Sequence, residues 1–200
     1  SYHVAMVQPR LAHHAKIVKI DTAEAEQMPG VSKIILAEAI KKAGGSNIMA
    51  EGNFHERSTV RFPSRKVLND EVIYRYGDVV ALVAADSKEH ARDAAAKVKV
   101  EIEKLPEYLN FLEAAMPDAK RIHEDTPNIF CQQPVLKGVG LEDASKVAEL
   151  IDNADFKTEG SFYSSREPHL SIEGVSVQAY FDEEGYLTFQ CKAQGVYSSI

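Results

Sequence analysis

The sequence is poor in cysteine and has no long apolar run. Cys131 and Cys191 are its two cysteines, too few for a disulfide framework, so we expect two reduced thiols. No apolar run approaches the roughly 18 residues of a membrane-spanning helix. The first residues have neither a basic start nor a long apolar middle, which argues against a signal peptide. We therefore expect a cytoplasmic protein with no membrane partner.

The sequence also lacks an excess of positive charge. Its formal net charge is -7, which argues against bulk affinity for DNA, RNA or anionic lipid. Hydrophobic residues make up 44% and charged residues 26% of the chain, a balance that allows a buried core. Two hundred residues suffice for one large domain or two small ones.

Complete catalytic motifs are absent as well. There is no P-loop and no glycine-rich dinucleotide motif after a strand; the lone G-x-G at 138–140 has the wrong surroundings. His13 and His14 are adjacent, so in a strand their rings face opposite sides and cannot share a metal ion. The residues alone therefore predict no nucleotide site.

His169 and Glu173 are four residues apart, the spacing that places two ligands on one face of a helix. Pro168 and Gly174 flank the pair and no second histidine follows, as a zinc-protease motif requires. We favour a partly buried histidine and a paired carboxylate over a metal site. No catalytic residue and no metal ligand is assigned.

The stretch 69–106 organises the chain and is predicted to be strand, helix, strand. Val79–Ala85 is an unbroken small and β-branched run, typical of a strand buried on both faces. Asp86 is a candidate helix N-cap, with Glu89 three residues later as in a capping box. From Val98 to Glu103 apolar and charged residues alternate, as in a strand with one wet face. The buried helix face is expected to consist of Ala91, Ala94, Ala95 and Val98.

Shorter elements are predicted on both sides of this stretch. Before it we expect strands at 4–7, 15–20 and 31–36, and helices at 21–27 (capped by Asp21) and 37–42. After it we expect helices at 110–115 and near 147–151, with Val147, Leu150 and Ile151 as an apolar face, then strands at 156–163, 175–181 and 186–190 with a turn at 183–185.

A long polar loop is predicted between residues 46 and 69. Loops of this length inside a compact domain are functional or mobile. Its basic side chains can meet an anion or a partner subunit, but a solvated loop is the favoured interpretation. These side chains are Arg57, Arg61, Arg65 and Lys66.

The character of the chain changes at Pro106. Prolines at 106, 117, 127 and 134 favour an extended connector made of turns and polyproline-like segments. A more β-rich part begins near Asp155. The sequence therefore predicts an α+β protein with a first domain at 1–105, an extended connector at 106–154 and the start of a second domain at 155–200.

Several stretches in the right order resemble the molybdenum hydroxylases, the family of xanthine dehydrogenases and aldehyde oxidoreductases. The wording is closest to the bacterial aldehyde oxidoreductases, and the resemblance covers nearly all 200 residues. The matching stretches are Met6–Gln8, His13–Ile17, Ile20–Thr22, Met28–Val31, Tyr76–Ala84, Val98–Pro106, Ile122–His123, Pro127–Asn128, Arg166–His169, Ile172–Glu173 and Gln194–Gly195.

The resemblance implies a fold and an activity. Residues 1–105 would be the family's α/β-hammerhead domain, and residues 155–200 the first, β-rich part of a molybdopterin-binding domain. Members of the family hydroxylate aldehydes, or N-heterocycles such as purines, with oxygen derived from water. The catalytic glutamate and the G-G-x-F-G pterin contact of the family lie further along and are not among these residues. We therefore expect a fragment that is inactive on its own and binds no cofactor.

The resemblance also implies one contact with the cofactor. Gln194 and Gly195 lie where many members carry a glutamine beside the molybdenum centre, although some aldehyde oxidoreductases have an aliphatic residue there. The alternative is that Gln194 is an ordinary polar residue at the end of a strand. Gly174 stands where the family usually has proline, so the local turn is expected to differ.

The expected cofactor of the full-length protein is molybdopterin in its cytosine dinucleotide form. Iron–sulfur clusters and FAD are expected in other domains or subunits, and the full-length protein is expected to be a homo-oligomer. The alternative from another class is a non-catalytic scaffold or subunit-interaction module of a larger complex.

Overall fold

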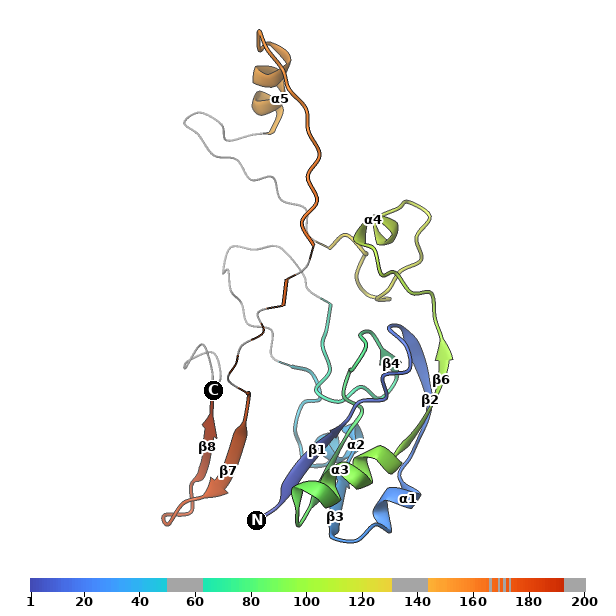
Figure 1. Ribbon diagram of the computed structural model, residues 1–200, viewed down its shortest axis with the longest axis vertical. Coiled ribbons are helices and arrows are strands. Elements are labelled where there is room, and N and C mark those ends of the chain that lie inside the picture. Colours follow the sequence, from blue (N-terminus) through green and yellow to red (C-terminus); the bar gives the residue numbers. More distant parts are fainter. Residues whose placement is uncertain are drawn as a thin grey trace. The chain divides into compact units, whose positions relative to one another are not determined.

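The computed structural model describes residues 1–49, 63–130, 144–165, 167–168, 170, 172 and 174–192 (Figure 1). The chain divides into two compact units, Ser1–Gln132 and Gln133–Ile200. The first unit therefore extends past Pro106 and includes part of the predicted connector. The domain boundaries expected near residues 105 and 154 stay a prediction.

The first unit contains a three-stranded antiparallel sheet with β5 (Ala81–Ala85) at its centre. Its neighbours are β1 (His3–Val7) and β3 (Val31–Ile35). The strand predicted at 79–85 is confirmed, but it begins two residues later, and the predicted full burial on both faces is found on one face only. Along β5, buried residues alternate with half-buried ones, because one face of the sheet is fully packed and the other only partly.

A second three-stranded sheet has the order β4 (Val72–Ile73), β2 (Ala15–Asp21), β6 (Lys99–Lys104). The alternation predicted after the helix is confirmed in β6, where Val100 and Ile102 are half-buried and the intervening charged residues are exposed. The strand begins one residue later than predicted because Val98 caps the preceding helix.

Helix α3 (Lys88–Lys97) joins the two sheets in sequence and packs against β1 and β5. The Asp86 N-cap prediction is wrong by one residue. Ser87 is the N-cap, with extended backbone, and its hydroxyl accepts a hydrogen bond of 3.1 Å from the His90 N–H. Asp86 instead pairs with the His90 ring, with 2.6 Å between Oδ1 and Nδ1.

Three short helices complete the first unit: α1 (Ala23–Glu26), α2 (Ala37–Lys42) and α4 (Phe111–Ala114). All three were predicted. The cap of α1 is again displaced by one residue, since the N-cap position is Thr22. Asp21 still serves the helix start, because its Oδ1 accepts a hydrogen bond of 3.1 Å from the Ala23 N–H.

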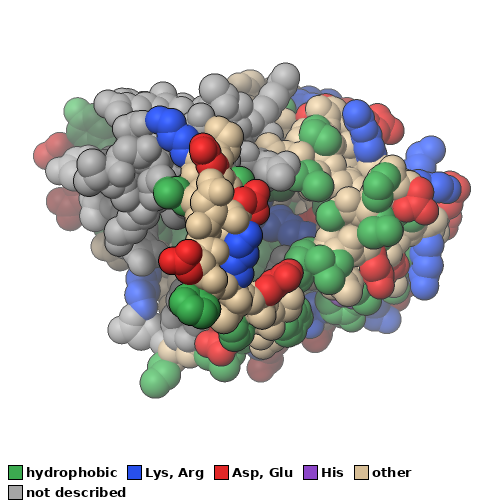
Figure 2. Space-filling model, turned by 90° about the horizontal axis from the view of Figure 1, so that it is seen from above, with side chains coloured by type: hydrophobic (Ala, Val, Ile, Leu, Met, Phe, Trp, Pro, Cys, Tyr) green, Lys and Arg blue, Asp and Glu red, His purple; other side chains and the backbone are tan. Residues whose placement is uncertain are grey.

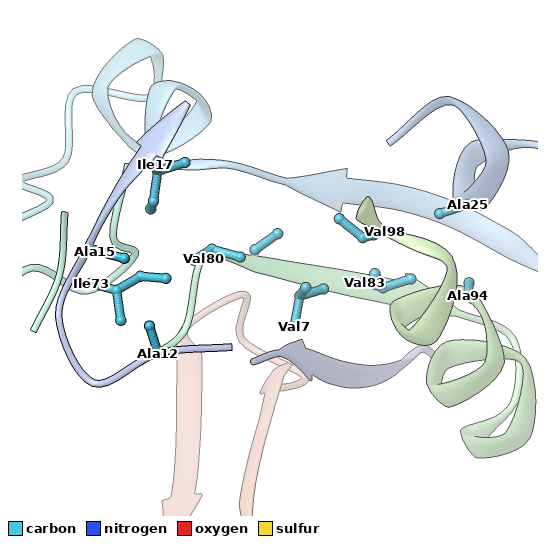
Figure 3. Close-up of a cluster of buried hydrophobic side chains, with 11 residues drawn as sticks. Val7, Ala12, Ala15, Ile17, Ala25, Ile73, Val80, Val83, Ala94 and Val98 are labelled. Carbon is cyan, nitrogen blue, oxygen red and sulfur yellow. The ribbon is translucent and has the colours of Figure 1, made fainter. Parts of the chain in front are cut away.

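The core of the first unit is built from small side chains (Figure 3). Ala94 of α3 and Ala25 of α1 are fully buried, and Figure 3 shows Ala94 beside Val83 of β5. Alanine adds little width, so helix and sheet approach closely. The buried cluster comprises Val7, Ala12, Ala15, Ile17, Ala25, Ile73, Val80, Ala81, Val83, Ala94 and Val98.

The second unit contains helix α5 (Ala144–Asp152) and the antiparallel pair β7 (Val177–Phe181) and β8 (Leu187–Cys191). The strand predicted at 156–163 is wrong: residues 156–163 form no strand, and Phe156 and Phe162 are almost fully exposed. Their apolar pattern suits a strand, but no described segment of this unit pairs with them.

Candidate functional site

The residues expected to contact a cofactor, Gln194 and Gly195, lie outside the described residues. The same holds for His169 and Glu173. Within the described ranges, no group of three or more histidine, cysteine or carboxylate side chains is arranged to hold a metal ion. No described helix is long and apolar enough to cross a membrane. The described strands nearest to Gln194 in sequence are β7 and β8. The first unit contains further clusters of polar side chains.

The β7–β8 hairpin leads directly toward Gln194. Its register pairs Val177 with Cys191 and Phe181 with Leu187. The turn predicted at 183–185 is confirmed, and Gly185 occupies the left-handed region at φ 87°.

Asp182 organises this turn in a way that the sequence pattern did not reveal. Its Oδ1 accepts hydrogen bonds from the backbone N–H groups of Glu184 (3.0 Å) and Tyr186 (2.8 Å). A carboxylate that binds backbone two and four residues ahead fixes the loop without help from another element. These hydrogen bonds therefore help to define the register of the hairpin.

One face of the hairpin is apolar and open to solvent. Every residue of β7 is exposed, and β8 is exposed except for one half-buried position. Cys191 is a free, exposed thiol. Cys131 lies outside the described residues, so the expectation of two reduced cysteines stays a prediction. The alternation places Val177, Ala179, Phe181, Leu187, Phe189 and Cys191 on the same face.

In the first unit, His13 and His14 have separate partners, as their adjacency predicted. The His13 ring lies 5.1 Å from that of Tyr76. His14 is buried, and its Nδ1–H donates a 2.7 Å hydrogen bond to the carbonyl oxygen of Pro106. The carbonyl has no proton, so this nitrogen must carry one. The two rings therefore contact different partners in the first unit.

The stretch before β5 is held by one buried carboxylate. Asp78 Oδ2 accepts hydrogen bonds from Asn69 Nδ2 (2.6 Å), the Tyr74 N–H (2.9 Å) and the Arg75 N–H (3.1 Å). Asp78 Oδ1 also accepts from Arg75 Nε at 3.1 Å. Asp78 matches the acidic position of the family stretch at 76–84, but its structural role was not predicted.

Part of the predicted basic cluster is engaged in ion pairs. Lys66 is half-buried and pairs with Asp70 and with Glu71, the latter at 2.7 Å. Burial alone would lower the pKa of Lys66, but the two carboxylates outweigh it and raise the pKa above its ordinary value. Lys66 is therefore not available for an external anion. Arg65 is exposed, and Arg57 and Arg61 lie outside the described residues.

Charges of both signs are interspersed on the surface of the described residues. In Figure 2, lysine and arginine side chains alternate with aspartate and glutamate, and apolar side chains lie between them. Neither sign of charge therefore dominates the described part of the face in this view.

Comparison with known proteins decides the family. The family profile described as "Aldehyde oxidase and xanthine dehydrogenase, a/b hammerhead domain" matches residues 1–106. The chain belongs to the aldehyde oxidase and xanthine dehydrogenase family. The resemblance found in the sequence motifs and the expected hammerhead fold are thereby confirmed.

Individual members of the aldehyde oxidase and xanthine dehydrogenase family match over nearly the whole chain. An aldehyde oxidoreductase from Megalodesulfovibrio gigas is 40% identical over 202 residues, which is 98% of this chain and 20% of the relative. The large molybdopterin subunit of nicotinate dehydrogenase from Eubacterium barkeri is 28% identical and covers 90% of this chain and 38% of the relative.

Solved structures give the same result. The aldehyde oxidoreductase from Desulfovibrio gigas superimposes with a TM-score of 0.84 at 40% identity, covering 99% of this chain and 21% of that chain. The enzyme from Desulfovibrio desulfuricans gives 0.83 at 38% identity, again covering 99% of this chain and 21% of that one. The chain thus spans about one fifth of the length of these aldehyde oxidoreductases.

Proposed function

We propose that these residues are part of a molybdenum-dependent oxidoreductase that hydroxylates aldehydes with oxygen derived from water. The observation that carries this proposal is the 40% identity with an aldehyde oxidoreductase over 98% of the chain. The alternative substrates are N-heterocycles such as purines, because a xanthine dehydrogenase from Gallus gallus also matches, at 27% identity.

The roles that we propose for the three parts of the chain are those of the corresponding parts in the family. Residues 1–105 form the hammerhead domain, 106–154 connect, and 155–200 open the molybdopterin-binding domain. When bound, the molybdenum cofactor supplies the redox chemistry, and the protein supplies binding and orientation. The role proposed for this chain is to hold the β7–β8 hairpin so that Gln194 and Gly195 reach the cofactor, with the Gln194 amide as a hydrogen-bond donor.

Cofactors and partners of the whole protein are part of the same proposal. We expect the cytosine dinucleotide form of molybdopterin, and electron transfer through iron–sulfur clusters to FAD or another acceptor in further domains or subunits. The 200 residues alone are expected to bind no pterin, because they include no G-G-x-F-G sequence. The full-length protein is expected to be a cytoplasmic homo-oligomer.

Substrate class is tested on the full-length protein purified from its source. Oxidation of a small aldehyde and of a purine is measured with an artificial electron acceptor, and kcat/KM is compared. We expect the aldehyde to be preferred by at least about tenfold, or about 1.4 kcal/mol of transition-state stabilisation. Preference for the purine would reassign the substrate. A native protein that contains no molybdenum and oxidises neither compound would favour the scaffold alternative.

The role of Gln194 is tested by Gln194→Ala in the same full-length protein. Losing one hydrogen-bond donor beside the reacting centre is expected to lower kcat by about tenfold or more while molybdenum is retained. Gln190→Ala is the matched control, because Gln190 is an exposed amide in β8 that contacts the Tyr180 hydroxyl at 3.2 Å. Equal activities of the two variants would contradict the assignment.

A further inference from the structure

Three aromatic rings from separate segments of the first unit form a stack. The rings of His14 and Tyr74 are 5.7 Å apart with 24° between their planes, and those of Tyr74 and His123 are 4.2 Å apart with 22° between them. His14 immediately precedes β2, and Tyr74 follows β4. His123 belongs to residues 107–130, here named the connector segment. The stack therefore joins the connector segment to the second sheet.

Hydrogen bonds hold the hammerhead side of this stack. His14 donates from Nδ1 to the Pro106 carbonyl, and its own carbonyl accepts a 3.1 Å hydrogen bond from the Leu105 N–H. The Tyr74 N–H donates to the buried carboxylate of Asp78. A hydrogen bond thus holds the His14 ring, and another holds the Tyr74 backbone; the Tyr74 ring contacts both histidine rings.

The connector segment is internally tied together around Asn128. Asn128 Oδ1 accepts a 2.9 Å hydrogen bond from the Ile122 N–H, and its Nδ2 donates to the carbonyls of Ala114 (2.9 Å) and Lys120 (3.0 Å). His123 directly follows Ile122 in this network. A change at the His123 ring is therefore passed to a folded segment rather than to a loose loop.

We propose that His123 is a pH-sensitive attachment between the connector segment and the hammerhead domain, closed when its imidazole is neutral and weakened when it is protonated. The neutral ring stacks half-buried on Tyr74. A protonated ring needs water around its charge, and the stacked position denies it part of that hydration. Protonation therefore favours the detached position.

The charged groups around His123 do not reverse the lowering of its pKa by burial. Burial lowers the pKa of His123 below its ordinary value of 6.5, the Asp125 carboxylate acts the other way, and His14 lowers it further. Burial raises the pKa of Tyr74 above 10.0, so its hydroxyl stays neutral in the relevant range. The other charged groups near Tyr74 are Lys66, Glu71 and Glu124.

The direction in which pH changes the attachment follows from the pKa values of His123 in the attached and detached states. Because the attached state has the lower His123 pKa, the detached state binds more protons between the two pKa values. The His123 contribution to attachment is therefore complete above pH 6.5 and falls as the pH drops through the lowered value. Carboxylates titrate mainly below pH 5, so the His123 effect is separated from theirs in pH.

The proposal is tested on the full 200-residue chain by hydrogen exchange of the connector segment at pH 7.5 and 5.5. After correction for intrinsic exchange chemistry, protection of residues 108–129 is expected to fall several-fold at the lower pH, while that of β5 stays constant. His123→Phe keeps an aromatic ring that cannot titrate, so its protection is expected not to depend on pH. His3→Phe, at an exposed histidine of β1, is expected to behave like the unchanged protein.

Two results would overturn the proposal. One is a pH response in His123→Phe as large as in the unchanged chain. The other, which needs no variant, is an NMR titration of the His123 ring in the unchanged chain with a pKa at or above 6.5. A titration below that value, together with a pH-independent His123→Phe variant, supports it.

Discussion

At the scale of single residues, Asp78 is the side chain whose removal has the clearest consequence. It is 8% exposed and accepts hydrogen bonds from two backbone N–H groups and from Asn69 and Arg75. Asn69 is buried, so its amide cannot recover the lost bond from water, whereas the exposed Arg75 can do so. The turn between β4 and β5 therefore depends on this one carboxylate.

We predict that Asp78→Ala lowers the free energy of unfolding by about 2–4 kcal/mol, because several donors lose their acceptor together. Urea denaturation measures the change. Asp93→Ala is the control, since it deletes an exposed carboxylate of α3 and is expected to change stability by less than about 0.5 kcal/mol. Equal effects of the two substitutions would show that the Asp78 hydrogen bonds contribute nothing.

Gly30 is a second position where one residue limits the structure. Its φ is +74°, and an added Cβ would run into Asp86 Oδ1 and His90 Nδ1. Its carbonyl also accepts a 2.9 Å hydrogen bond from the Asp86 N–H. The site combines a left-handed backbone with a crowded side-chain position.

Gly30→Ala is expected to be more destabilising than Gly44→Ala. Both place alanine at positive φ, since Gly44 has φ +79°, but nothing lies within 4 Å of an added Cβ at Gly44. We expect about 1 kcal/mol from the backbone at each site and at least about 1 kcal/mol more at Gly30, where the Asp86–His90 pair must separate. Thermal denaturation of both variants gives the difference; its absence would mean that the pair moves aside freely.

At the scale of elements, an ion-pair cluster joins α1 to the end of α3 and the start of β6. Glu24 lies 2.9 Å from Lys97 Nζ and 2.8 Å from Lys99 Nζ. Hydrogen bonds from Lys99 and Lys97 lower the pKa of Glu24 from 4.5 to about 2. All three side chains are substantially exposed, so salt screens the cluster.

Glu24→Gln is predicted to reduce the fall in the free energy of unfolding between pH 4.5 and pH 2. A carboxylate whose folded pKa is depressed contributes stability that is complete above pH 4.5 and is lost as the pH falls toward 2. The difference between the two proteins is therefore expected above pH 4.5, to shrink below it and to diminish in 1 M salt. Denaturation across pH 2–7 measures it. A difference that persists at pH 2 would contradict an ionic origin.

The contact between α3 and its sheet is tested by Ala94→Asp. Ala94 is 0% exposed, so aspartate there buries a charge without a partner, and we expect a loss of about 3 kcal/mol or more. Ala96→Asp makes the same change two residues later on the exposed side of α3. We expect it to cost only about 0.5 kcal/mol, from a negative charge near the helix C-terminus. Similar melting temperatures would mean that the buried face is wrongly assigned.

Local patterns in the sequence predicted where helices and strands form better than they predicted which residues and segments contact one another. The alanine spacing of α3 and the alternation in β6 were confirmed, because periodicity reports which face is buried. Two adjacent residues, Asp86 and Ser87, can both cap a helix. Ser87 is the N-cap, while Asp86 pairs with the His90 ring. The apolar pattern at 156–163 does not form a strand, since a strand requires a partner that pattern alone cannot supply.

The candidate site was less predictable than the fold. The residue types and their spacing in the sequence predicted neither the role of Asp78 nor the His14–Tyr74–His123 stack, because the contacting groups come from separate segments of the chain. Only the family resemblance pointed to Gln194 and Gly195, and the described residues end before them. Their role therefore stays a prediction.

At the scale of the whole molecule, the chain corresponds to about one fifth of its aldehyde oxidoreductase relatives. The apolar face of the β7–β8 hairpin is exposed, with Phe181 72% and Phe189 62% accessible. A two-stranded hairpin is marginally stable by itself in water. If the proposed function is right, we expect further parts of the full-length protein to cover this face.

The most direct measurement is the molybdenum content and intact mass of the native protein that carries this sequence, purified from its source. The oxidoreductase account predicts stoichiometric molybdenum and a polypeptide several times larger than the 22.1 kDa of these residues. A polypeptide of about 22.1 kDa that contains no molybdenum would contradict the account and favour the interaction module.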